Sequence, residues 1–111
     1  MNKNEYIPNG WCIIEQVTEE RGTDYYVFAS WSGGYLDGDS WKRNSGITQI
    51  EEDGDDYLFH GYTGSVYRCS KNSEGRISSY NGAILNNLCE KMNATVIRVE
   101  DMKLTRAIKG E

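Results

Sequence analysis

The sequence predicts an α+β domain in which one small antiparallel β-sheet of five or six strands, built from hairpins and a meander, packs against one α-helix. Turn dipeptides that contain glycine recur at short intervals along the 111 residues, and the segments between them are rich in β-branched and aromatic residues. One later segment instead repeats apolar residues at helical spacing. We therefore expect a single globular domain over residues 1–111, with 1–10 and 109–111 the segments most prone to disorder.

The first strands are expected to form a hairpin. Residues 11–18 and 25–31 are both dense in apolar side chains, and the short link between them has Gly22 near its centre. The following stretch, 32–46, contains four glycines and no clear periodicity. We expect it to be a long loop, and loops of that length in small domains often carry function.

A meander is expected next. Residues 47–52 and 57–62 flank the pair Asp53-Gly54, and Asp-Gly between two such runs is a strong hairpin signal. Residues 66–70 follow after a second glycine-containing turn. These three segments should therefore lie antiparallel, each beside the next.

The helix is predicted near residues 82–92. Ser79 or Asn81 could cap its first turn, and Asn93 can adopt the left-handed conformation that ends a helix. Residues 95–99 then alternate as a last strand. The apolar stripe at period 3.6 is formed by Ile84, Leu85, Leu88, Cys89 and Met92.

The charge is unevenly distributed. Residues 1–56 carry twelve acidic and four basic side chains, whereas 57–111 carry five acidic and eight basic ones, for a net charge of −5. Because the first half would repel a phosphate backbone, we expect no direct binding to nucleic acid and expect attraction to a basic protein surface.

The chain carries no apolar run long enough to cross a membrane and no secretory signal, so we expect a cytoplasmic protein without membrane partners. Its three cysteines, an odd number without close spacing, are expected to be free thiols.

An acidic run is the most distinctive motif. It is interpreted either as a solvated hairpin tip or as a negative patch that docks on a basic surface, because the spacing of its oxygens does not match a helix–loop–helix calcium site. The run consists of Glu51, Glu52, Asp53, Asp55 and Asp56.

The predicted loop supplies aromatic side chains that could anchor the same partner. Tyr35 and Trp41 are of the types that concentrate at binding hot spots, and Asp37 and Asp39 add negative charge. The alternative is that Trp41 closes the hydrophobic core. With the acidic run, these four residues complete the predicted partner-binding site.

Catalytic and metal chemistry find little support. His60 is the only histidine, and Cys69, flanked by Arg68 and Lys71, could approach it across a hairpin as a nucleophile pair. The four soft ligands that zinc would need lie on separate segments. We expect no catalytic residues, no metal and no cofactor.

The favoured hypothesis is a non-catalytic acidic protein-binding module. Its size and charge are similar to those of small acidic proteins that phages and other mobile elements encode, some of which inhibit host nucleic-acid-handling machinery. In that form, an anti-defence inhibitor would dock its acidic hairpin on the basic, nucleic-acid-binding groove of a host protein. The alternative is a structural protein that forms a homodimer or another small homo-oligomer through its edge strands.

Overall fold

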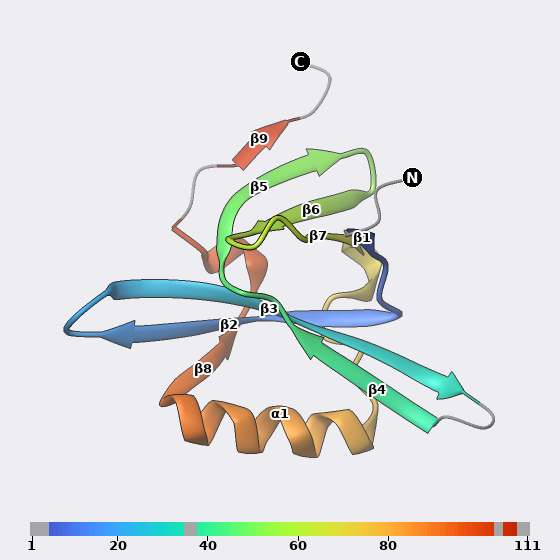
Figure 1. The fold of residues 1–111 in the computed structure, drawn as a ribbon. Helices are drawn as coiled ribbons and strands as arrows, with labels where there is room; N and C mark the ends of the chain where they lie inside the picture. The colour runs from blue at the N-terminus through green and yellow to red at the C-terminus, as the bar shows by residue number, and fades with distance from the viewer. Residues whose placement is uncertain (1–4, 35–37, 104–105, 109–111) are drawn as a thin grey trace.

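Two β-sheets pack face to face, and one α-helix covers the far side of the second sheet (Figure 1). The computed structural model describes residues 5–34, 38–103 and 106–108. Sheet A has the strand order β1-β7-β6-β5-β9, and sheet B has the order β4-β3-β2-β8. The α+β class is thus confirmed in its coarse form, but the expectation of one sheet of five or six strands is wrong. The strands divide into sheets of five and four.

Sheet B contains the predicted first hairpin. Strands β2 and β3 pair antiparallel from Gly10↔Ser30 to Thr18↔Gly22. The predicted loop over 32–46 is wrong, because a further strand inside it pairs with β3. The register of this pairing shifts between Trp31 and Gly34. The strands are β2 (Gly10–Thr18), β3 (Gly22–Gly34), β4 (Gly38–Arg43) and β8 (Ala94–Ile97).

Sheet A contains the predicted meander, in which β5, β6 and β7 are antiparallel neighbours. Two short strands extend it in parallel, β1 beside β7 and β9 beside β5, so the sheet is not purely antiparallel. The strands are β1 (Glu5–Tyr6), β5 (Ile47–Asp53), β6 (Asp56–Gly61), β7 (Val66–Ser70) and β9 (Arg106–Ile108).

The chain passes from sheet B to sheet A through a tight corner between β4 and β5. Asn44 is buried there, and its side-chain Oδ1 accepts hydrogen bonds from the backbone N–H groups of Val27 (3.0 Å) and Gly46 (3.3 Å). Gly46 has φ of +118°, in the region that favours glycine. Asn44 therefore fixes the point at which the chain leaves sheet B and enters β5 of sheet A.

Helix α1 (Ser79–Met92) begins earlier than predicted. Ser78, rather than Ser79 or Asn81, is the N-cap, and its Oγ accepts from the N–H of Asn81 at 3.2 Å. The helix ends at Asn93 with φ of +55°, as the sequence predicts. The strand expected over 95–99 stops at Ile97, because Val99 begins a short 3₁₀-helix (Val99–Asp101); a second such turn covers Lys71–Ser73.

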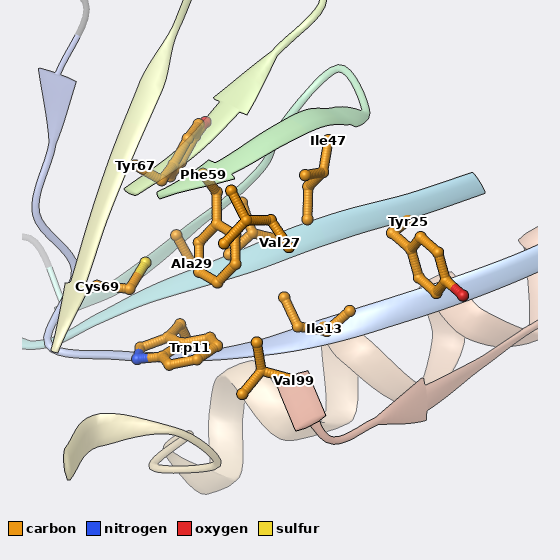
Figure 2. Packing of buried hydrophobic residues seen from close by; sticks show 11 residues of the cluster. Trp11, Ile13, Tyr25, Val27, Ala29, Ile47, Phe59, Tyr67, Cys69 and Val99 are labelled. Atoms are coloured by element: carbon orange, nitrogen blue, oxygen red, sulfur yellow. The ribbon is translucent and has the colours of Figure 1, made fainter. Parts of the chain in front are cut away.

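The main core lies between the two sheets (Figure 2). Trp11 is fully buried there, and its ring centroid lies 5.3 Å from that of Phe59 and 5.8 Å from that of Tyr57. Its Nε1 donates to the carbonyl of Ser70 at 2.7 Å, so the largest buried side chain is also satisfied as a donor.

A second, smaller cluster lies between sheet B and the helix. Its buried members are Cys12, Ile14, Phe28 and Leu85. Because side chains alternate along a strand, β2 sends Trp11 toward sheet A and Cys12 toward the helix. The two clusters together explain why this strand is apolar on both faces.

Candidate functional site

The acidic run lies at the tip of the β5–β6 hairpin of sheet A, around a turn in which Gly54 has φ of +61°. The alternation along the strands buries Ile50 and Phe59 against sheet B and turns Glu51 and Leu58 to the other face. Helix α1 covers sheet B on the far side of the molecule (Figure 1), so this outer face of sheet A points away from the helix.

Arg68 of β7 holds three of the neighbouring carboxylates. Its guanidinium contacts Glu5 at 2.8 Å and both Asp53 and Asp56 at 3.3 Å. The hydrogen bond to Glu5 is the largest cause of a raised pKa for Arg68, and burial partly opposes it. Strand β7, the tip of the β5–β6 hairpin and strand β1 are thus held together by ion pairs to one guanidinium.

Two further pairs flank this network. Lys71 Nζ lies 2.8 Å from Glu52 and 5.1 Å from the centroid of the Tyr57 ring, and its pKa is raised, chiefly by the hydrogen bond to Glu52. His60 Nε2 is hydrogen-bonded to Glu51. Most of the predicted acidic run is therefore paired with basic or histidine side chains of the protein itself.

Within the described part of the chain, the cluster contains more acidic than basic side chains. Six carboxylates lie around two permanent cations, Arg68 and Lys71. Asp55 is exposed at the tip, and the side chains of Asp53 and Asp56 are 39% and 31% exposed. We refer to these carboxylates as the acidic cluster: Glu5, Glu51, Glu52, Asp53, Asp55 and Asp56.

The predicted aromatic anchor does not join the acidic cluster. Trp41 lies on β4 of sheet B, where its ring stacks on Phe28 with centroids 5.4 Å apart and planes at 11°. Phe28 belongs to the cluster beneath the helix, so Trp41 and the acidic cluster lie on opposite sides of sheet B. Trp41 covers the smaller core cluster through Phe28 and is still 38% exposed.

Asp39 is the other residue of the predicted loop site that the structure describes. Asp39, also on β4, accepts a hydrogen bond from the backbone N–H of Gly33 at 3.3 Å. Tyr35 and Asp37 lie outside the described residues. The structure therefore brings together the acidic run of the predicted site and places Trp41 and Asp39 apart from it on β4.

His60 and Cys69 do not form the nucleophile pair considered from the sequence. In the β6–β7 register His60 lies opposite Val66, whereas Cys69 lies opposite Tyr57. Cys69 is fully buried between the sheets, and burial raises its thiol pKa well above the usual value, which opposes thiolate formation. Within residues 5–34, 38–103 and 106–108, no three histidine, cysteine or carboxylate side chains are grouped as a metal site would require.

Sequence reasoning missed Glu5 as a member of the acidic cluster and Arg68 and Lys71 as the cations paired with it. The meander itself carries the signal that could have found Arg68. Its register places Arg68 opposite Leu58, and Leu58 opposite Glu51, in one row across three strands. Glu5 reaches the cluster only because β1 pairs in parallel with β7, a contact between residues far apart in the chain.

Comparison with protein-family models, curated proteins and solved structures yields no match for this chain. Among the described residues, α1 is too short and too polar to span a bilayer.

Proposed function

We propose that the protein is a non-catalytic protein-binding module whose acidic cluster docks on a basic protein surface. The observation that carries this proposal is the gathering of six carboxylates around Arg68 and Lys71 at one end of sheet A, counted over the described residues. A cationic groove of a host protein, of the kind that binds nucleic acid, has the charge that this cluster would attract. An inhibitor that covers such a groove is the specific form that we favour.

The internal ion pairs support this proposal through pre-organisation. Arg68 fixes Glu5, Asp53 and Asp56 around one guanidinium, so a partner would meet carboxylates whose positions are already set. Less side-chain entropy is then lost on binding. The pairing also weakens the attraction, and we therefore expect association that is rapid at low salt and strongly screened above about 0.1 M.

Cytoplasmic location is part of the proposal. Cys12, Cys69 and Cys89 are all free, which fits a reducing compartment.

The test is capture of a partner from a lysate of the expressing cell across a salt series. The triple variant Glu51→Gln, Asp55→Asn and Asp56→Asn removes three charges from the acidic cluster. The matched control, Glu19→Gln, Glu20→Gln and Glu90→Gln, removes three exposed charges elsewhere. Loss of the same captured protein with the first variant only, and its release by salt, would support the proposal. Equal capture by the two variants would contradict it.

The alternative of a homo-oligomer has one observation in its favour, which is that sheet B ends in β4 on one side and β8 on the other. Light scattering at micromolar to millimolar concentrations separates the two functions. A purely monomeric protein would count against assembly and leave the docking proposal intact.

A further inference from the structure

A groove runs between the edge strand β4 and helix α1, on the side of sheet B opposite the acidic cluster. Two adjoining cavities of about 260 and 410 Å³ form it, and they share Trp41 and Leu88 as walls. The helix adds Ile84, Asn87 and Lys91, and β4 adds Lys42 and Arg43. The exposed part of Trp41 is therefore one wall of a hollow with an apolar floor.

The charge of this groove is opposite to that of the protein as a whole. None of the described residues that line the two cavities is acidic, whereas the chain as a whole has a net charge of −5. The guanidinium of Arg43 is held at the wall, 4.7 Å from the Tyr26 ring centroid and 3.4 Å from the sulfur of Met92. Lys91 is exposed, and within the described part of the chain no carboxylate lies within ion-pair distance of it.

The backbone of β4 supplies a second kind of recognition. β4 is the last strand of sheet B, and the N–H of Asn44 donates to the carbonyl of Val27 at 3.1 Å. Hydrogen-bonded and non-hydrogen-bonded pairs alternate in an antiparallel ladder. The backbone N–H and C=O of Lys42 therefore point toward β3, whereas those of Trp41 and Arg43 point outward. An added strand could pair with those outward groups.

We propose that this groove binds an acidic peptide in extended conformation, which adds to sheet B as a strand beside β4. Trp41 and Arg43 are two residues apart and share one face of β4, so their cross-strand neighbours on the peptide are also two residues apart. The peptide places an aliphatic side chain against Trp41 and a carboxylate against Arg43, and Lys91 on the helix adds a second positive charge to the groove. This site is independent of the acidic cluster.

A peptide fits these features better than a small anion or a second copy of the chain. A small anion would use the cations but leave the apolar wall and the outward backbone groups without partners. A second copy could reach the groove with its acidic cluster, but that cluster lies around a hairpin turn rather than along an open strand edge. When a peptide binds by strand addition, main-chain hydrogen bonds supply the affinity and contacts of every second side chain supply the specificity.

The probe for the test is the acetylated and amidated peptide Thr-Glu-Thr-Leu-Thr-Glu-Thr, which offers the required spacing in both strand directions. In a titration of the ¹⁵N-labelled full chain, we expect saturable shifts of the Trp41 and Arg43 amide signals. Replacing both peptide glutamates by lysine, or the leucine by serine, should weaken binding by at least about fivefold, the effect of losing one contact of about 1 kcal/mol.

A matched pair of protein variants separates the groove from general charge. Lys91→Glu should weaken binding of the probe by about fivefold or more, whereas Arg76→Glu, the same charge change at another exposed cation, should not. Unshifted Trp41 and Arg43 amides at millimolar peptide, or equal binding of the lysine-substituted peptide, would overturn the proposal. Shifts of the same amides that depend on protein concentration without peptide would overturn it in favour of a second copy.

Discussion

The two sides of sheet B are packed very differently. Toward sheet A it buries Trp11 with aromatic neighbours from β6 and β7, including Phe59 and Tyr67, all at most 3% exposed. Toward the helix its buried cluster is small, and Leu85 is the only member from α1. A whole sheet closes the first side, whereas one 14-residue helix closes the second.

This difference explains where recognition surfaces arise. A helix is narrower than the four-stranded sheet beneath it, so the edge strands β4 and β8 remain flanked by hollows. On the side closed by sheet A, the proposed docking surface is instead the charged end of that sheet. We infer that the inter-sheet core sets the stability of the fold and that the helix side tolerates change.

The sharpest test of this inference is truncation in the inter-sheet core. Phe59→Ala removes a fully buried ring that contacts Trp11 and Tyr57, and we expect a loss of about 3–5 kcal/mol in the free energy of unfolding. Chemical denaturation followed by tryptophan fluorescence measures it. A loss below about 1.5 kcal/mol would show that the core relaxes around the cavity and would remove the contrast between the two sides.

Leu85→Ala is the matched truncation on the helix side. Leu85 is 7% exposed and belongs to the smaller cluster, so we expect a loss of about 2 kcal/mol, at the low end for a buried leucine. The same denaturation experiment gives the value, and amide exchange should show α1 opening before the strands. A cost equal to that of Phe59→Ala would contradict the ranking.

The sequence predicts the local elements well because their signals are local. The hairpins at Gly22 and Gly54, the meander and the helix stop at Asn93 all depend on turn chemistry or on neighbouring residues. Strand β4 escaped prediction because most of its side chains are polar, and the contacts that stabilise it, such as the stacking of Trp41 on Phe28, come from residues distant in the chain. The division into two sheets depends on the corner at Asn44, which no periodicity reveals.

The candidate site was predictable only as a list of residue types. The excess of carboxylates at residues 51–56 is visible in the sequence, but the cation that organises it, Arg68, arrives from the next strand of the meander. The grouping of Trp41 with those carboxylates rests on its residue type, which concentrates at binding hot spots, and residue type carries no information on spatial proximity. Strand alternation turns Trp41 to the helix side, and the sequence does not say which face of a strand a helix covers.

Alkaline pH probes both sides of sheet B at once. Burial raises the thiol pKa of Cys12 on the helix side to about 12, and raises that of Cys69 in the inter-sheet core. Above a pH of about 9 the unfolded thiols ionise while the folded ones stay protonated, so stability should fall as pH rises, by up to about 1.4 kcal/mol per unit and per group.

Two matched cysteine variants show which thiol causes this loss of stability at alkaline pH. Cys12→Ala and Cys69→Ala should each flatten the decline of stability between pH 9 and pH 11, relative to their own stability at pH 7. Denaturation midpoints at each pH measure it. Tyr67, whose pKa burial raises to about 12, adds a smaller decline that begins nearer pH 10 and persists in both variants. A flat profile in the unmodified protein would show that these thiols reach solvent.

The smallest effect concerns the acidic cluster, where Arg68 and Lys71 differ in the number of carboxylates they hold. Arg68→Met leaves Glu5, Asp53 and Asp56 close together without their shared cation, and we expect a loss of about 1 kcal/mol, because the site is partly exposed and screened by solvent. Lys71→Met should have a smaller effect, since it breaks the partly exposed pair with Glu52 rather than contacts with three carboxylates. Thermal denaturation at low ionic strength resolves the difference.

Added salt separates charge from packing in this last comparison. If repulsion among the three carboxylates causes the loss, 0.5 M NaCl should recover most of the stability of Arg68→Met and little of that of Leu85→Ala. A loss in Arg68→Met that salt does not change would mean that the hydrogen bonds of the guanidinium, rather than its charge, account for the loss, because methionine keeps the aliphatic packing. The acidic cluster would then be organised by these hydrogen bonds and not by charge.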